Sequence, residues 1–400
     1  MNRNISALYS IALKPSKLII GLMSGTSLDG LDVALCRFSG SGLQTSVDVL
    51  QFETVPYDDG FRKEIRTVFS KKEVSLEKLT LLHPWIALQH AGIINKLLKK
   101  WNVKNDAVDI IASHGQTIYH APKNLHQQNK FSNATLQIGD GDHLAVATGI
   151  ITISDFRQKH IAAGGEGAPL AVYGDHLVFG KQGENRILLN IGGIANFTYL
   201  PGSRDATKIF STDTGPGNTM MDAYMQQQFP GKYFDANAAV ALQGNINAAL
   251  LSALKENDFF AQPFPKTTGP ELFNLQYLQQ AKERSATQHI SIADTMCTLN
   301  KFSADTIVDA MIQNMEPRKD YTVFTSGGGM HNPLLMQSLR ESLPDSYFSD
   351  TSALNINPDA KEAVLFAVLA NECICGEGND GQKGAKGMPA ITMGKISFPW

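Results

Sequence analysis

The order of the strand and helix patterns is the feature of this sequence that most restricts its fold, because the order occurs twice. In each half, three strand patterns in a row precede helical sequence, a fourth strand, another helix and a fifth strand. The repeat predicts a duplicated α/β fold, with two domains of one topology and a ligand in the cleft between them. The segments are 17–23, 31–38, 47–55, 76–101, 108–113, 142–148 and 150–154 in the first half, and 186–191, 194–200, 207–210, helices through 250 and at 291–314, 321–325, 332–343 and 346–349 in the second, before a last helix at 359–373.

Composition and charge exclude several classes of partner. A chain of 400 residues with 43% hydrophobic content can form more than one core. The net charge of −3 is spread over the chain, without a basic stripe for nucleic acid or a Lys/Arg cluster for a membrane surface, so we expect small-molecule partners. No segment is long and apolar enough to span a membrane, and we expect a cytoplasmic protein. The cysteines form neither a zinc pattern nor a disulfide framework, which fits a reducing compartment: Cys36, Cys297, Cys373 and Cys375.

The stretch FSTDTGPGNTMMDAY places a carboxylate, a glycine turn and a helix start within a few residues. The strand pattern before it closes at Ser211, so we expect Asp213 at a strand end. Gly215 and Gly217 allow a turn whose backbone can approach a ligand closely.

A helix is predicted to begin directly after this turn, with Asn218 or Thr219 as its N-cap. Free N–H groups and the positive end of a helix beside a carboxylate suit a phosphate, with Asp213 facing the group that the phosphate will join. A tight strand-to-helix turn whose aspartate only caps its own backbone gives the same pattern.

Three glycine-bearing loops fall at corresponding places in the predicted order: SGTSLDG at 24–30, DTGPGN at 213–218 and SGGGMHN at 326–332. The sequence lacks a P-loop, and it lacks the dinucleotide-binding GxGxxG after a first strand. Together the loops suit two phosphate-facing turns and one adenine-facing turn around a nucleotide. The topology resembles that of the actin, hexokinase and Hsp70 group of ATP-dependent proteins, whose domains are ribonuclease H-like.

A longer series of motifs resembles the anhydro-N-acetylmuramic acid kinase family, from near residue 17 to near residue 394. The number and order of these motifs make the resemblance far more specific than any one glycine loop. They are GLMSGTSLDGLDVAL, ASHGQTIYH, QIGDGDHLA, DFRQKHIAAGGEGAPL, LLNIGGIANFTYL, FSTDTGPGNTMMDAY and TSGGGMHNPLLM.

The resemblance implies an enzyme of cell-wall recycling that uses ATP and water to open 1,6-anhydro-N-acetylmuramic acid and to phosphorylate O6, giving N-acetylmuramate 6-phosphate. It implies that Asp213 is the base that activates water, and that Arg157 and Glu362 line the sugar site. It also implies Mg²⁺, without assigning its ligands, and a homodimer. The implied ATP-binding residues are Ser24, Gly25, Thr26, Ser27, Leu28, Asp29, Gly30, Leu31, Gly215, Gly217, Asn218, Gly327, Gly328 and Gly329.

The residue types agree with this chemistry. Phosphoryl transfer needs positioning and charge stabilisation, which the backbone N–H groups of SGTS and GPGN can supply together with Mg²⁺. Opening an acetal with water needs one placed carboxylate base. Because O6 is both the leaving group and the phosphoryl acceptor, the γ-phosphate can take over the charge that a general acid would otherwise neutralise.

Several of these residues also have ordinary structural explanations. Arg157 fits a surface ion pair, and Glu362 fits an acidic residue in the first turn of a helix. In SHGQT, His114 and Gln116 could contact a ligand or satisfy a strand end, and we favour the strand end for His114. Asp29 and the nearby Asp32 could orient Mg²⁺ through water or simply finish a hairpin.

The chain departs from the family pattern at three positions. Family members commonly read DFRxxD, GGQGAPL and an arginine after PKTTG, where this chain has His160, Glu166 and Pro270. Glu166 adds negative charge near a site that is expected to receive anionic ligands. These exchanges bear on affinity and specificity more than on fold or reaction type.

Two other functions fit the sequence. One is a kinase for another amino sugar, in which Asp213 deprotonates a sugar hydroxyl, and the other is a non-enzymatic ATP-binding module. The first domain is expected at 17–156 together with 385–400, and the second at 157–384.

Overall fold

The computed structural model describes residues 2–168, 170–315, 320–376 and 391–400. The chain forms two compact units. The first unit contains Met1–Phe179, Asp205–Thr207 and Asn355–Trp400, and the second unit contains Gly180–Arg204 and Lys208–Leu354. In the described part of the chain no helix combines the length and the apolar character that crossing a membrane requires.

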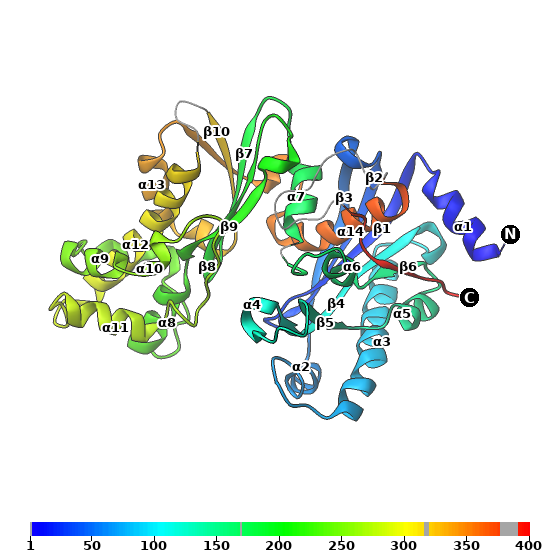
Figure 1. Ribbon diagram of the computed structural model, residues 1–400, viewed down its shortest axis with the longest axis horizontal. Coiled ribbons are helices and arrows are strands. Elements are labelled where there is room, and N and C mark those ends of the chain that lie inside the picture. The colour runs from blue at the N-terminus through cyan, green and yellow to red at the C-terminus, as the bar shows by residue number, and fades with distance from the viewer. Residues whose placement is uncertain (1, 169, 316–319, 377–390) are drawn as a thin grey trace. The chain divides into compact units, whose positions relative to one another are not determined.

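A mixed sheet forms the centre of the first unit (Figure 1). Its strands are β1 (Ser16–Ser24), β2 (Gly30–Ser39), β3 (Ser46–Pro56), β4 (Ile110–Ala121), β5 (Ala134–Ile138), β6 (Thr152–Ser154) and β12 (Lys395–Ser397). The order across the sheet is β12-β6-β4-β1-β2-β3, and β5 pairs with β4. The first three strands are antiparallel neighbours, while β4 runs parallel to β1 and β6 runs parallel to β4.

The sheet of the second unit repeats this arrangement. Its strands are β7 (Asn185–Ile191), β8 (Ile194–Leu200), β9 (Phe210–Pro216), β10 (Tyr321–Ser326) and β11 (Ser346–Asp350). Here β7, β8 and β9 are antiparallel neighbours, and β10 and β11 run parallel on the other side of β7. The predicted duplication is therefore confirmed, and β9 is an edge strand of its sheet.

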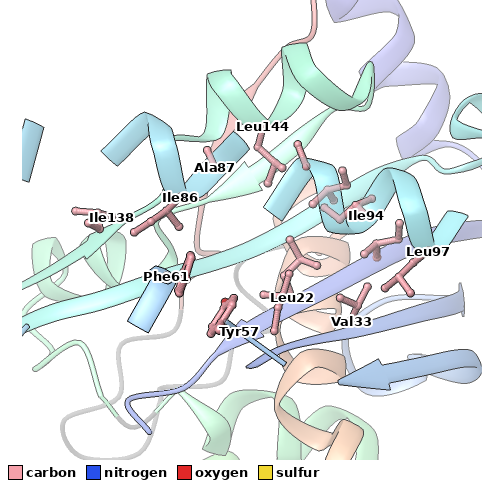
Figure 2. Packing of buried hydrophobic residues seen from close by; sticks show 14 of the residues in the cluster. Leu22, Val33, Tyr57, Phe61, Ile86, Ala87, Ile94, Leu97, Ile138 and Leu144 are labelled. Carbon is pink, nitrogen blue, oxygen red and sulfur yellow. The ribbon is translucent and has the colours of Figure 1, made fainter. Parts of the chain in front are cut away.

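Helices cover both faces of the first sheet. The helices of this unit are α1 (Arg3–Ala12), α2 (Asp59–Arg66), α3 (Leu76–Lys100), α4 (Lys123–His126), α5 (Gly141–Thr148), α6 (Phe156–Ala162), α7 (Ala171–Phe179) and α14 (Lys361–Cys375). Figure 2 shows Ile86 and Ile94 of α3 in one cluster with Leu22 and Val33 of the sheet. Side chains alternate along a strand, so Gly21 faces the other side, where a Cβ on Gly21 would lie 1.9 Å from the carbonyl oxygen of Ala363 in α14. A glycine is therefore required for α14 to approach β1 so closely.

The second unit has two apolar clusters that share one long helix. Its helices are α8 (Thr219–Gln228), α9 (Ala248–Lys255), α10 (Asp258–Ala261), α11 (Leu275–Arg284), α12 (Ile292–Asn314) and α13 (Pro333–Ser342). Ile307 and Met311 of α12 pack with Ile187 and Val323 of the sheet. Phe302, also on α12, belongs to a second cluster built largely from helices.

Three differences from the sequence-based expectation bear on the site and on the bounds of the two units. Strand β9 does not close at Ser211 but continues to Pro216, so Asp213 lies within a strand. The first unit extends to Phe179 rather than to residue 156, because α14 and α7 pack together within it. The chain also returns to the first unit at Asn355 rather than at 385, because α14 packs on β1, β2 and β4. Residues 385–390 lie outside the described part of the chain.

Candidate active site

Asp213 is half-buried in the middle of β9, and the chain around it is held by backbone hydrogen bonds. Its N–H donates to the carbonyl oxygen of Lys266 (2.9 Å), and its Oδ2 accepts from the N–H of Thr268 (2.8 Å). Burial raises the pKa of Asp213, the Thr268 N–H opposes that rise, and the negative charge of Glu271 adds to it. The carboxylate is thus fixed in direction and made more basic than one in water.

The turn after Asp213 is tight, but its N–H groups are already engaged. Gly215 has φ +144°, and a Cβ on Gly217 would lie 2.3 Å from the carbonyl oxygen of Gly192. The N–H groups of Gly217, Asn218 and Thr219 donate to carbonyl oxygens of Gly192 and Gly193 in the β7–β8 hairpin, at 2.8, 2.8 and 3.0 Å. The expectation that these amides are free to bind phosphate is therefore wrong for this structure, because hairpin and turn satisfy each other. Asn218 occupies the N-cap position, yet its side chain makes no capping bond and donates to Ile191 instead.

The third glycine loop borders a cavity in the second unit. Gly327 has φ +80°, and a Cβ on Gly329 would lie 2.2 Å from Cγ2 of Ile191, so the loop lies tightly against β7. The cavity has a volume of about 340 Å³, within the range of small-ligand sites. Its lining brings together two predicted residues, Asn218 and Gly328, and others that the sequence did not single out: Met221, Asp222, Phe234, Asp235, Ala236, Asn237, His331 and Asn332.

Two of the added lining residues give the cavity its chemical character. Phe234 is 62% exposed, which is unusual for a large aromatic ring and leaves its face available for stacking. Burial raises the pKa of Asp222 to about 6. Asp222 follows the glycine turn by one helical turn, so helical spacing from Asn218 could have indicated it.

In the first glycine loop, the buried residues support the loop, and the exposed residues are available to a ligand. The Ser24 hydroxyl donates to Oε1 of Gln116 (2.5 Å) and hydrogen-bonds to the Tyr57 hydroxyl (2.8 Å), which in turn contacts Nε2 of His90 (2.9 Å). Ser24 and Gln116 therefore form a buried support for the loop. The side chains beyond it that remain exposed are Thr26, Ser27 and Asp29.

Arg157 lies at the start of α6 and is fixed by two acceptors. Its Nε donates to Nε2 of His114 (3.0 Å), and its Nη1 donates to the carbonyl oxygen of Gly167 (2.6 Å). Burial and the nearby arginine lower the pKa of His114 to about 3, which keeps its ring neutral and able to accept. His114 also bonds the carbonyl oxygen of Gly115, as a strand-end role predicts, but its contact with Arg157 was missed.

Glu362 lies in the first turn of α14, as expected, and its side chain is exposed. Burial lowers the pKa of Arg157, and the charge of Glu362 opposes this effect, so the two groups are electrostatic neighbours within the first unit. The two residues assigned to the sugar by resemblance therefore lie in one electrostatic environment.

His160, one of the departures from the family pattern, supports the loop that holds Arg157. Its Nδ1 accepts from the N–H of Gly167 (2.8 Å), and its ring lies against Gly165, where a Cβ would be 2.2 Å from Cε1. The pKa of His160 is lowered by burial and by Arg157. Glu166 between the two glycines is exposed.

No group of three or more His, Cys, Asp or Glu side chains in the described residues could hold a metal ion. Asp32 accepts a hydrogen bond from the Thr54 hydroxyl (2.5 Å), while Asp29 is exposed in the first glycine loop. This donor set fits Mg²⁺ held mainly by nucleotide phosphates and water, with at most one or two protein carboxylates.

Comparison with known proteins gives one consistent family. The sequence model of the family described as "Anhydro-N-acetylmuramic acid kinase" matches residues 17–397. Proteins named anhydro-N-acetylmuramic acid kinase from Pseudoalteromonas atlantica and Pseudoalteromonas translucida are each 56% identical to this chain, over 400 and 399 residues and over 100% of both chains. One from Caldanaerobacter subterraneus is 36% identical over 98% of this chain and 99% of its own length.

Proposed function

This chain belongs to the anhydro-N-acetylmuramic acid kinase family, and from that premise we propose how its residues carry out the reaction. The chain is a phosphotransferase. It uses ATP and water to open 1,6-anhydro-N-acetylmuramic acid and to phosphorylate O6, which yields N-acetylmuramate 6-phosphate for peptidoglycan recycling. The observation that carries the proposal is the half-buried carboxylate of Asp213, held from one side by a backbone N–H.

Asp213 is assigned as the base that activates water. Its Oδ2 is occupied by the Thr268 N–H, and no described residue donates a hydrogen bond to Oδ1. Oδ1 is therefore available to accept a proton from a water molecule that attacks C1. Burial raises the pKa of Asp213, which increases the basicity of its carboxylate.

The residues assigned to ATP act in two ways, some through their side chains and others through the close packing of their backbone. The nucleoside is assigned to the cavity bordered by Gly328 and Asn218, with Phe234 stacking on the base. The exposed hydroxyls of Thr26 and Ser27 are assigned to the phosphates. Gly215, Gly217, Gly327 and Gly329 are assigned to the nucleotide through the close backbone packing that they allow, and not through hydrogen bonds from their N–H groups to the phosphates.

The sugar is assigned to Arg157 and Glu362. The guanidinium of Arg157 provides the positive charge that the lactyl carboxylate of the substrate needs, and its fixed Nε and Nη1 contacts set its direction. Glu362 is an acceptor for sugar hydroxyls. Mg²⁺, when bound with ATP, supplies charge neutralisation for the transferred phosphoryl group, with Asp29 as a protein oxygen within the phosphate loop.

Release of ADP tests the substrate assignment directly. ATP turnover should depend on the 1,6-anhydro sugar and should be absent with free N-acetylmuramate or N-acetylglucosamine. Turnover with free N-acetylmuramate would favour a simple hydroxyl kinase instead. ATP binding without sugar-dependent ADP release would favour a non-enzymatic module.

Isotope labelling tests the order of bonds. In ¹⁸O-water the label should enter the C1 hydroxyl and be absent from the phosphate ester bridge, because the bridging oxygen is O6 of the substrate and does not come from water. The anhydro bridge occupies the β face, so water attacks from the opposite face, and rapid NMR should detect the α-anomer first. A β-anomer formed first, or label in the ester bridge, would exclude this mechanism.

The remaining assignments concern the whole protein. A cytoplasmic location is supported by the use of ATP, and a homodimer is what the resemblance implies. Light scattering at several protein concentrations tests the dimer, since a constant mass near 43.5 kDa would exclude it.

A further inference from the structure

A short segment of the second unit, residues 264–268, lies along the free edge of β9, and we call it the strap. The N–H of Asp213 donates to the carbonyl oxygen of Lys266 (2.9 Å), and the N–H of Lys266 donates to the Thr212 hydroxyl (3.0 Å). The Thr268 N–H then reaches Oδ2 of Asp213 (2.8 Å). The strap therefore pairs with the edge of β9 at the position of the base and orients its carboxylate.

The side chain of Lys266 attaches the strap to the rest of the unit. Lys266 is 7% exposed, and its ammonium donates to the carbonyl oxygens of Phe259 (3.0 Å) and Phe260 (3.2 Å) in α10. The ammonium also lies 4.6 Å from the ring centre of Phe259 and 4.4 Å from that of Phe264. Carbonyl oxygens at the C-terminal end of a helix and aromatic faces both attract a cation.

This lysine is unusual in its surroundings. Among the described residues no carboxylate lies within ion-pair distance of the Lys266 ammonium, and burial lowers the pKa of Lys266. A buried cation without a counter-ion is costly, and an apolar side chain of similar length would avoid that cost. A specific role for the ammonium explains why the site contains a lysine.

A cavity beside the Lys266 ammonium leaves room for the strap to move if the ammonium is removed. Lys266 and Thr214, the residue after the base, both line a cavity of about 140 Å³ in the second unit. A strap released from α10 could move into this space, and the Thr268 N–H would move with it. Two other charged residues, Lys255 and Asp309, line this cavity. The charged residue that acts on the pKa of Asp213 is Glu271, which raises it.

We propose that Lys266 is a positioning residue for the base: its ammonium holds the strap to α10, and the strap's Thr268 N–H holds the Asp213 carboxylate in the direction that catalysis needs. The inference rests on the proposed role of Asp213. Lys266 itself touches neither substrate in this assignment. Its effect reaches the reaction through the main chain of the strap.

The central test compares Lys266→Met with a matched control, Lys282→Met. Lys282 in α11 is also 7% exposed and lies 5.1 Å from the ring centre of Tyr224, but it has no contact with the strap. Lys266→Met should lower kcat by about 10- to 100-fold, the order of loss expected from a misplaced catalytic group, with little change in KM for ATP. Lys282→Met should keep kcat near that of the parent protein.

The pH profile separates positioning from a general loss of stability. The Thr268 N–H stabilises the ionised form of Asp213, so its loss raises the pKa of the base. The acid limb of kcat/KM should therefore move to higher pH in Lys266→Met and stay in place in Lys282→Met. A fall in kcat with an unmoved acid limb, or a parental kcat in Lys266→Met, would overturn the proposal.

Two further variants keep the test decisive. Thr268→Pro removes the same N–H without touching Lys266, so it should move the acid limb in the same direction even if Lys266→Met fails to fold. An unmoved limb in Thr268→Pro would also overturn the proposal. Asp213→Asn is measured in the same assay. High turnover in Asp213→Asn would exclude both the assignment of Asp213 as the base and this inference. Loss of turnover in Asp213→Asn, together with a parental kcat in Lys266→Met, would exclude this inference alone.

Discussion

At the scale of single residues, the proposed reaction depends on one carboxylate whose two oxygen atoms have different roles. Oδ2 of Asp213 accepts from the Thr268 N–H, and Oδ1 is assigned to the attacking water. Asp213→Asn keeps the shape and this anchoring acceptor but removes the base. Turnover should fall by two or more orders of magnitude, while ATP and sugar binding measured by calorimetry remain close to the parent values. Near-normal turnover would show that another group activates the water.

His160 makes a prediction about pH. Its Nδ1 must be unprotonated to accept from Gly167, and its pKa in the folded protein is lowered by burial and by Arg157. The unfolded chain therefore takes up a proton first as the pH falls below about 6.5, so this stabilising contribution is complete above that pH and is lost below it. His160→Gln retains an acceptor and does not titrate. Its free energy of unfolding should fall less than that of the parent between pH 7.5 and pH 5 in urea titrations.

The matched control for this experiment is His289→Gln, because His289 is exposed. His90 and His114 also have lowered pKa values, about 4 and about 3, so the parent protein will still lose stability in acid. Only the difference between variant and parent reports on His160. Equal pH slopes in His160→Gln and His289→Gln would contradict the prediction.

At the scale of elements, the close approach of α14 to β1 depends on a single missing side chain. Gly21→Ala would place Cβ 1.9 Å from the carbonyl oxygen of Ala363, so helix and strand must separate. Overpacking of this kind costs about 1–3 kcal/mol, and we expect a loss of that size in urea unfolding. Gly92, exposed in α3, has no atom within 4 Å of the corresponding Cβ, and Gly92→Ala should instead stabilise by about 0.5–1 kcal/mol. A tolerated Gly21→Ala would mean that α14 packs more loosely than described.

Elements whose apolar residues repeat at a regular spacing could be predicted from the sequence, and the supports of the site could not. The strand at 185–191 and the helix at 292–314 were expected within one residue or two, because burial imposes their patterns. The continuation of β9 through Gly215 and Pro216 was missed because those residue types usually end strands. The strap was missed because its bonds to Asp213 join residues more than 50 positions apart, which local pattern does not encode.

The same distinction applies to the candidate site. Asp213 and the glycine loops stand out by composition and by family resemblance. The engagement of the turn amides with Gly192 and Gly193 follows from how a hairpin and a turn meet, so the prediction of free N–H donors there was wrong. The contact between His114 and Arg157 likewise needs β4 and α6 side by side, and neither segment alone indicates it.

At the scale of the whole molecule, the residues assigned to one reaction come from both units, so ligand binding should be visible in each. Hydrogen exchange with a non-hydrolysable ATP analogue should show protection around Thr26 and Ser27 in the first unit. It should also show protection of Gly328–His331 and of the start of α8 in the second unit. The anhydro sugar should protect the first turns of α6 and α14. Protection by the ATP analogue in one unit only would require a new assignment of the phosphate loop.

The division of the first unit along the chain also affects its synthesis. A ribosome releases β1 and β4 early, but α14, which packs on both strands, ends at Cys375. At about 5–20 residues per second, roughly 10–40 seconds of translation separate the end of α7 from the end of α14. During that interval the whole second unit emerges and can complete its own core, while the nascent first unit still exposes the apolar face around Gly21. A chain whose synthesis stops after Leu354, the end of the second unit, but before α14 begins at Lys361 would therefore have one complete unit and one unit open to chaperones and proteases.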